Sequence, residues 1–291
     1  MKIPYEGIIP SVNYHLWEPC NMRCKFCFAP FYDAKKLLPK GHLPKEQSLQ
    51  LVQNLATFGF EKITFAGGEP TLCPWISDLI YEAKKFGMTT MVVTNGSNLS
   101  ENFLEQNREV LDWVIISVDS LSEETNLKSG RTLNGKKVYR KEDYFHWVDQ
   151  IRNYGYRLKI NTVVHQLNYQ EVMHEIIEYA RPERWKVFQV LPVIGENDQH
   201  IDEFVITDEM FNTFIKNHYG FQEKGILVKE SNCEMKDSYV MVDPAGRFYN
   251  NKNGFQEYSR SILDNTVDNT YREMNYNSQN FIKRRGIYNW K

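Results

Sequence analysis

The segment CNMRCKFC, residues 20–27, follows closely on the alternating stretch SVNYHLW, residues 11–17. Three cysteines within eight residues put three thiols on one tight loop, a spacing typical of metal binding in a chain whose five cysteines do not read as a disulfide framework. Three thiolates can ligate three irons of a [4Fe–4S] cluster and leave the fourth iron open. A structural zinc ion is the alternative, but zinc usually takes its fourth ligand from a second pair. Cys73 and Cys233 have no partner at such a spacing, so we expect both to be free of metal.

Outward from this loop, strand-like and helix-like segments alternate. Apolar and β-branched runs predict strands at 11–17, 62–66, 89–94, 112–119, 157–164 and 184–193. Amphipathic stretches predict helices at 45–60, 75–87, 100–111, 139–155 and 169–180. Strands separated by helices indicate βα units and a parallel sheet. After residue 200 the pattern changes to a predicted helix at 207–220, short strands at 226–231 and 238–243, and a last helix at 261–274.

Three further motifs lie at the carboxyl ends of predicted strands, where parallel α/β barrels have their sites. They are AGGEP at 66–70, TNG at 94–96 and SVD at 117–119. Together with the cysteine triplet, and with Phe26 inside it, they resemble the radical S-adenosylmethionine family in order and context. The resemblance implies an α/β fold: a partial (β/α)6 barrel, residues 1–200, and a C-terminal α+β extension, residues 201–291, that covers the barrel and the active site.

The same resemblance implies the cofactors. Cys20, Cys24 and Cys27 would hold a [4Fe–4S] cluster, whose open iron chelates S-adenosylmethionine. The residues implied for S-adenosylmethionine are Gly67, Gly68, Glu69, Asn95 and Ser117. The glycine pair would let the backbone approach the ligand, and the adjacent carboxylate would receive its ammonium group. Electron transfer into the sulfonium would release a 5′-deoxyadenosyl radical.

A closer resemblance covers almost the whole chain. Segments including SVNYH at 11–15, ISVDS at 116–120, ESN at 230–232, KDSY at 236–239 and KRRGIYNW at 283–290 are similar to the viperins. This implies a dehydratase that converts a nucleoside triphosphate to its 3′-deoxy-3′,4′-didehydro analogue, an antiviral chain terminator. CTP is the first candidate substrate, followed by UTP or GTP, and a flavodoxin-type or ferredoxin-type protein would donate electrons. The alternatives are another radical enzyme acting on a phosphorylated small molecule and a zinc-bearing nucleotide-binding module.

The viperin resemblance also implies roles for single residues. Arg131 would bind the carboxylate of S-adenosylmethionine. Tyr239 would line the sugar or the triphosphate and take part in catalysis. The tail that ends near Trp290 would fold over the nucleotide.

Strand periodicity gives a separate argument for an anionic substrate. Side chains alternate along a strand, and the outer faces of a barrel must pack on helices. A polar set therefore faces the lumen: Asn13, Lys62, Lys159, Asn161, Arg184 and Lys186. Buried cations destabilise a protein unless they are neutralised. They could reach the open end of the barrel or pair with acidic side chains, but cations on three strands at once favour a bound polyanion such as a triphosphate.

Composition limits the partners. A net charge of −2 provides no basic field for nucleic acid. No stretch approaches the ~18 apolar residues of a membrane span, and the first residues lack the pattern of a secretory signal. We therefore expect a cytoplasmic monomer that binds neither nucleic acid nor membrane.

Overall fold

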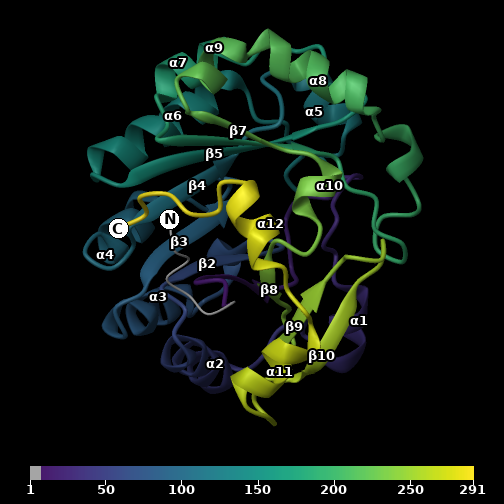
Figure 1. The fold of residues 1–291 in the computed structure, drawn as a ribbon. Coiled ribbons are helices and arrows are strands. Elements are labelled where there is room, and N and C mark those ends of the chain that lie inside the picture. The colour runs from purple at the N-terminus through teal and green to yellow at the C-terminus, as the bar shows by residue number, and fades with distance from the viewer. Residues whose placement is uncertain (1–7) are drawn as a thin grey trace.

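The computed structural model describes residues 8–291, which form one curved sheet with helices around its outside (Figure 1). The strands are β1 Ser11–Trp17, β2 Lys62–Gly67, β3 Thr89–Thr94, β4 Trp113–Ser117, β5 Arg157–Val164, β6 Arg184–Gln189, β7 Leu227–Glu230, β8 Val240–Val242, β9 Arg247–Asn250 and β10 Glu257–Ser261. The helices are α1 Tyr32–Leu37, α2 Lys45–Phe58, α3 Ile76–Lys85, α4 Glu101–Asn107, α5 Glu123–Lys128, α6 Lys141–Asn153, α7 His174–Ala180, α8 Asp208–Asn217, α9 Tyr219–Glu223, α10 Asn232–Met235, α11 Val267–Glu273 and α12 Ser278–Lys283, with short 3₁₀ turns at Pro70–Leu72 and Ile201–Glu203.

Strands β1 to β6 are parallel and lie side by side in chain order. Each pair is joined by helical segments, as the alternation of strands and helices predicts. The helices bury apolar stripes against the outer face of the sheet, for example Leu51, Val52 and Leu55 of α2. The apolar residues of these strands lie mainly on the outer face, which the helices cover, and the polar ones face the cavity inside. The α/β fold expected from the sequence is confirmed.

Residues 201–291 extend the same sheet at both of its edges. Strand β7 pairs in parallel with β6, and β8 pairs in parallel with β1. Strands β9 and β10 then continue the β8 edge as antiparallel neighbours. Residues 231–239 cross from one edge to the other. The division of the chain at residue 200 stays a prediction, and strands on both sides of it share one sheet.

Several predicted boundaries are wrong, two of them for a local reason. Helix α7 begins at His174 rather than 169, because the Asn168 side chain donates to the carbonyls of Asp119 and Val163 and holds a turn there. The last predicted helix, 261–274, begins only at Val267, because Ser261 ends β10, a turn follows it, and the Thr266 hydroxyl caps α11. The sixth strand ends at Gln189 rather than 193.

The C-terminal tail closes the amino-terminal end of the barrel. The Trp113 indole, at the start of β4, donates to the carbonyl of Trp290 at 3.0 Å. Arg157, at the start of β5, donates to the carbonyls of Asn289 and Lys291. In Figure 1 this segment runs from α12 across the strands to the C-terminus. Within residues 8–291, no helix has the length and apolar character needed to cross a bilayer.

Candidate active site

A cavity of about 340 Å³ lies inside the barrel, and all of the site residues predicted from the sequence line it. They are Cys20, Cys24, Cys27, Gly67, Gly68, Glu69, Asn95, Ser117, Arg131, Asn13, Lys62, Lys159, Asn161, Arg184, Lys186 and Tyr239. The fold therefore brings together side chains that lie far apart in the sequence. The most distant two of this set, Asn13 and Tyr239, are 226 residues apart. Which ligand each residue contacts stays a prediction.

The cysteine loop lies at the end of the cavity where the parallel strands have their carboxyl ends. Cys20 and Cys24 are half-buried and Cys27 is exposed. Burial raises the pKa of the Cys20 thiol to about 11 and that of Cys24 to about 12. A bound cation is what would offset this penalty on the thiolate form.

The three thiols fit an iron–sulfur cluster by their chemistry and placement. They are soft ligands on one loop, and they face one cavity. Within the described residues, no group of three His, Cys, Asp or Glu side chains is placed to share a single metal ion. Cluster ligation does not require such a group, because each thiolate binds a different iron.

The glycine pair at the end of β2 holds the cysteine loop. The Gly68 amide donates to the Trp17 carbonyl at 2.5 Å, and the Glu69 amide donates to the Pro19 carbonyl at 3.0 Å. A Cβ atom added at Gly68 would lie within 3.0 Å of the carbonyls of Glu18 and Pro19. The close approach that requires glycine here is therefore to the backbone before Cys20, a role that the sequence did not indicate.

Glu69 joins the carboxyl ends of two strands. Its Oε1 accepts from the backbone amide of Thr71 at 3.1 Å and from the hydroxyls of Thr71 and Thr94 at 2.6 and 2.8 Å. Its Oε2 accepts from the Asn95 amide at 2.7 Å. Burial raises the pKa of this carboxyl, while the hydrogen bonds oppose that shift. Within residues 8–291, Oε2 accepts only this one bond, so it can accept another from a ligand.

Asn95 connects the cysteine loop to the end of β3, and Arg131 binds the residues at the end of β4. The Asn95 amide donates to the Asn21 side chain at 3.0 Å. Arg131 forms a buried ion pair with Asp119, with 2.8 Å between Nη1 and Oδ2, and donates to the Ser117 carbonyl at 2.5 Å. Its Nε is buried and has no partner in the described residues. Arg131 is therefore already charge-compensated by Asp119.

The opposite end of the cavity carries a dense group of cations. Lys62 and Arg184 begin β2 and β6, and Lys159 and Lys186 lie two residues inside β5 and β6. Arg284, just after α12, joins them. We call these five cations, together with Glu230 at the end of β7, the floor cluster.

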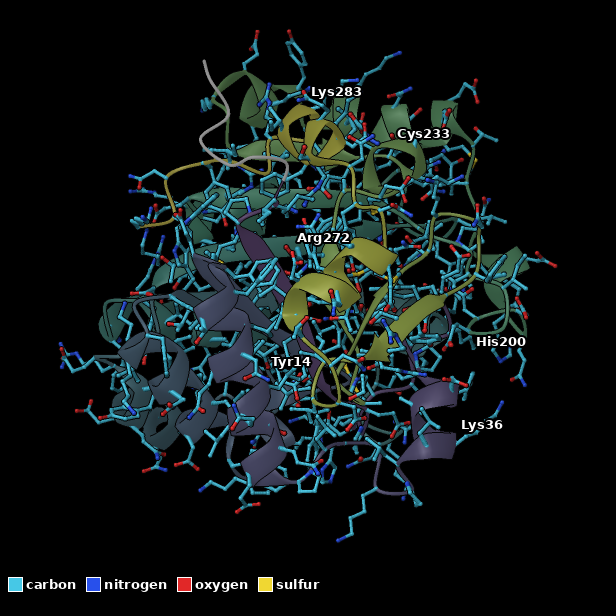
Figure 2. All side chains as sticks on the ribbon, turned by 60° about the horizontal axis from the view of Figure 1, so that its bottom comes forward. Tyr14, Lys36, His200, Cys233, Arg272 and Lys283 are labelled. Atoms are coloured by element: carbon cyan, nitrogen blue, oxygen red, sulfur yellow. The ribbon has the colours of Figure 1, made fainter. Side chains whose placement is uncertain are left out.

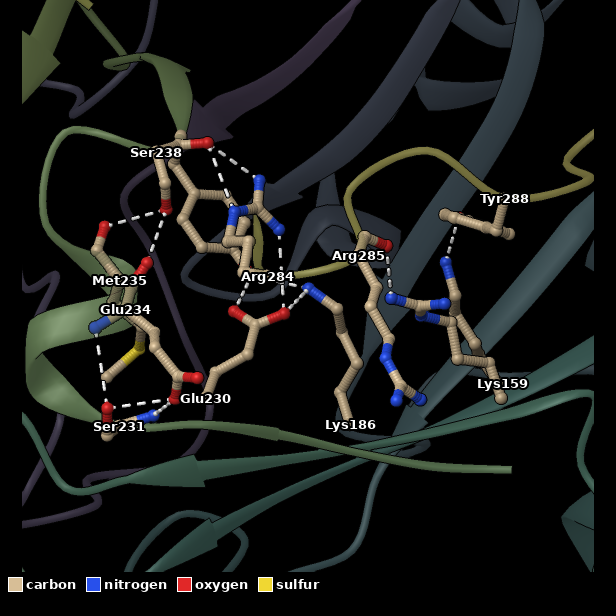
Figure 3. A network of polar contacts seen from close by, with 12 residues as sticks. Lys159, Lys186, Glu230, Ser231, Glu234, Met235, Ser238, Arg284, Arg285 and Tyr288 are labelled. Carbon is tan, nitrogen blue, oxygen red and sulfur yellow. Dashed lines mark hydrogen bonds and ion pairs between the residues drawn. The ribbon is translucent and has the colours of Figure 1, made fainter. Parts of the chain in front are cut away.

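Glu230 is the carboxylate at the centre of the floor cluster. Figure 3 shows Lys186 and Arg284 both pointing toward it. The Lys186 Nζ lies 2.5 Å from Glu230 Oε1, and an Arg284 nitrogen lies 3.5 Å from the same oxygen. The Tyr239 hydroxyl donates to Glu230 and accepts from Lys186. Arg284 also donates to the Ser238 carbonyl at 2.7 Å.

The other three cations of the floor cluster face aromatic rings and not carboxylates. Lys62 lies 4.6 Å from the centre of the Trp290 ring, and Lys159 and Arg184 each lie 4.4 Å from the centre of the Tyr288 ring. Within residues 8–291 none of the three forms an ion pair. Pairing with acidic residues was the alternative considered for Lys62, Lys159, Arg184 and Lys186, and among these four it holds for Lys186. Arg284, which periodicity did not predict, also pairs with Glu230.

Burial and mutual repulsion act together on the lysines. Both lower the pKa of Lys62 and Lys159 well below the usual lysine value. Burial lowers the pKa of Lys186 to about 7, although Glu230 opposes the shift. A polyanion in this end of the cavity would reverse these shifts.

Periodicity could not identify Glu230, Arg284 and Tyr288 as members of this site. Their positions depend on the crossing at 231–239 and on the docked tail, which no local pattern specifies. The signal that could have pointed to them was the similarity of the segments ESN at 230–232 and KRRGIYNW at 283–290 to the viperins.

Comparison with known proteins identifies the family. Residues 16–180 match the Radical SAM superfamily. The chain is 56% identical over 290 residues to an S-adenosylmethionine-dependent nucleotide dehydratase of Flammeovirga pacifica, with 98% of each chain covered. It is 53% identical to one from Lacinutrix mariniflava, covering 97% of this chain and 59% of that protein.

More distant relatives agree with this. The dehydratase RSAD2 of Oncorhynchus mykiss is 36% identical, with 96% of this chain and 80% of that protein covered. The solved structure of anSMEcpe with bound AdoMet and the Cp18Cys peptide has a TM-score of 0.70 at 17% identity, covering 96% of this chain and 84% of that one, and it shares the fold. The chain therefore belongs to the radical SAM superfamily and, within it, to the S-adenosylmethionine-dependent nucleotide dehydratases, the enzyme family that includes RSAD2 (viperin).

Proposed function

We propose that this enzyme dehydrates a nucleoside triphosphate to its 3′-deoxy-3′,4′-didehydro analogue, with CTP the first candidate and UTP or GTP behind it. The observation that carries the proposal is the floor cluster, in which five buried cations surround one carboxylate. Three of these cations have no carboxylate partner in the described residues. A triphosphate supplies the negative charge that they lack.

The energetics favour such a ligand over an empty lumen. Burying an unpaired charge destabilises a folded protein. A charge-assisted hydrogen bond to a phosphate oxygen contributes roughly 1.5–3 kcal/mol. Several such bonds would offset the burial and the repulsion from neighbouring cations that lower the pKa values of Lys62, Lys159 and Lys186 in the empty protein.

At the other end of the cavity, Cys20, Cys24 and Cys27 would hold a [4Fe–4S] cluster. The residues proposed to hold S-adenosylmethionine are Gly67, Gly68, Glu69, Asn95, Ser117 and Arg131. When bound, the two cofactors supply a 5′-deoxyadenosyl radical that removes the 4′ hydrogen of the nucleotide. A flavodoxin-type or ferredoxin-type protein would donate the electrons.

The middle of the cavity would hold the ribose. Asn13 and Asn161 line it, and the Asn161 Oδ1 is buried without a hydrogen-bond partner in residues 8–291. These amides can orient the ribose hydroxyls. Loss of the 3′ hydroxyl as water requires a proton, and Lys186 with Tyr239 forms a hydrogen-bonded pair that can hold one at the Tyr239 oxygen. One further electron completes the didehydro product.

The test is anaerobic turnover with each nucleoside triphosphate, its diphosphate and the bare nucleoside. We expect 5′-deoxyadenosine and a product lighter by one water and retaining all three phosphates, from at least one triphosphate. Equal turnover of a nucleoside and its triphosphate would overturn the proposal. The rival function is that of a radical enzyme acting on a different phosphorylated small molecule, which the floor cluster could also bind. The same assay with other phosphorylated metabolites separates the two functions.

A further inference from the structure

His15, on β1, is an immobilised histidine in the cavity wall that the mechanism above does not use. Its ring makes edge-on contacts with Phe28, Phe31 and Tyr249, with centroid distances of 6.1, 5.3 and 5.7 Å. The residue lines the cavity and is only 7% exposed. Contacts on three sides fix the ring plane, so the direction of its polar atoms is fixed as well.

The two ring nitrogens of His15 differ in what they can reach. Neither forms a hydrogen bond within residues 8–291. Nδ1 is fully enclosed, whereas Nε2 is not and is the nitrogen that can reach the cavity. A buried N–H without an acceptor is rarer and less favourable than a buried acceptor without a donor. We therefore assign the proton to Nε2, which makes His15 a hydrogen-bond donor to the cavity. Burial lowers the pKa of His15 to about 3, so the ring is neutral and brings no positive charge to balance a phosphate.

Asn251 provides a second unpartnered group nearby. It follows directly on β9, lines the cavity and is 8% exposed, and its amide forms no hydrogen bond in the described residues. In the sheet, Met241 pairs with Tyr249, the residue whose ring contacts His15. Asn251 lies two positions after Tyr249, just beyond the end of β9. His15, Asn251, Met241 and Phe28 together form what we call the side wall.

The side wall is a part of the cavity lining that belongs to neither of the two assigned ends. The floor cluster carries the charge that a triphosphate needs, and the cysteine loop with the ends of β2 to β4 belongs to the cofactors. The side wall has no charge, two apolar side chains and two unpartnered polar groups. A flat heteroaromatic ring with polar edges has the matching chemistry.

We propose that the side wall is the nucleobase subsite, in which His15 donates a hydrogen bond to an acceptor on the edge of the base and Asn251 pairs with a neighbouring edge atom. Met241 and Phe28 would contact the faces of the ring. This inference rests on the proposed function and adds the determinant of base preference. A carbonyl oxygen or unprotonated ring nitrogen is the acceptor that His15 requires; cytosine offers both, whereas uracil offers carbonyl oxygens alone.

The variants for the test are His15→Phe, which keeps an aromatic ring but removes the donor, and Asn251→Leu, which keeps the approximate volume but removes the amide. Affinities for CTP, UTP, GTP and inorganic tripolyphosphate are measured by calorimetry on the reconstituted enzyme without reductant. Loss of one neutral hydrogen bond corresponds to roughly 2- to 13-fold in affinity. We expect the preferred nucleotide to weaken by about that factor in each variant, and preference among the bases to shrink. Tripolyphosphate and S-adenosylmethionine should bind as before.

Two results would overturn the inference. If nucleotide affinities and their ranking do not change, the side wall does not contact the base. If tripolyphosphate and every nucleotide weaken equally, His15 acts on the whole barrel. Failure of the proposed function is seen separately, as the absence of turnover of any nucleoside triphosphate by the unchanged enzyme, because the binding comparison does not depend on turnover.

Discussion

Lys186 Nζ lies 2.5 Å from Glu230 Oε1, and this buried ion pair joins β6 to β7 at the floor of the barrel. Glu230 also accepts from the Tyr239 hydroxyl, and Tyr239 immediately precedes β8, which lies on the other side of β1 in the sheet. Strands β7 and β8 are not hydrogen-bonded to each other through their backbones in the described residues. Side chains therefore close the barrel where the backbone leaves it open, and they do so within the proposed substrate site.

Glu230→Gln should destabilise the empty enzyme, because removing one partner of a buried ion pair leaves the other charge uncompensated, a loss of about 3–5 kcal/mol in comparable pairs. Added CTP should then raise the Tm more than it does in the unchanged protein, since the nucleotide replaces the missing negative charge. Thermal unfolding with and without CTP measures both effects. Glu234→Gln is the matched control: Glu234 caps α10 nearby through Ser231 and does not contact the floor cations (Figure 3). Equal Tm values for the two variants would contradict the central role of Glu230.

Lys62→Met should have the opposite effect on the empty enzyme. Lys62 has only aromatic partners, Tyr288 and Trp290, so removal of its charge relieves repulsion and should raise the Tm. The same variant loses a charge-assisted bond to the nucleotide, and its KM for CTP should rise roughly 10- to 150-fold. Steady-state kinetics and thermal unfolding provide the two readouts. Exposed Lys136→Met serves as the control. A lower Tm with an unchanged KM would mean that Lys62 has a structural role.

The depressed pKa of Lys186 predicts how stability depends on pH. In the unfolded chain this lysine titrates near 10.5, and in the empty folded protein near 7. Between these values the unfolded state binds more protons, so the free energy of unfolding should rise as the pH increases from 7 toward 10.5. Nucleotide binding raises the pKa again, so binding at pH 8 should take up protons. Calorimetry in buffers of different ionisation enthalpy detects this, and binding without proton uptake would contradict the assignment.

The cysteine assignments predict metal content. Cys20→Ala, Cys24→Ala and Cys27→Ala should each lose the cluster, while Cys73→Ala and Cys233→Ala should keep about four irons and four sulfides per chain. Cys73 is buried in the apolar core, and Cys233 is exposed on α10 (Figure 2). Iron and sulfide analysis after anaerobic reconstitution gives the answer. A zinc content of one per chain with no sulfide would point to the metal alternative instead.

The sequence predicted the features that depend on local patterns and missed those that depend on contacts between distant segments of the chain. The six βα units and the lumen-facing lysines follow from local periodicity, and they were predictable. The route of residues 201–291 was not, because β7 and β8 join opposite edges of one sheet and no local pattern specifies which edge a short strand joins. Glu230 and Arg284 were missed for the same reason, since they reach the floor only after both edges and the tail are in place. The turn at Asn168 was missed because its side-chain hydrogen bonds compete with the helix.

Gly68→Ala tests the contact between β2 and the cysteine loop. The new Cβ would lie within 3.0 Å of the carbonyls of Glu18 and Pro19, and backbone atoms cannot move aside as a flexible side chain can. The loop that begins at Cys20 must therefore shift away from β2, and the variant should lose about 1–3 kcal/mol of stability, the usual range for overpacking. Gly220→Ala, in α9, is the control, because a Cβ there has nothing within 4 Å and alanine favours a helix. We expect lower iron retention after reconstitution for the first variant and unchanged retention for the second. Full iron retention in Gly68→Ala, together with a normal Tm, would show that the cysteine loop does not depend on this contact.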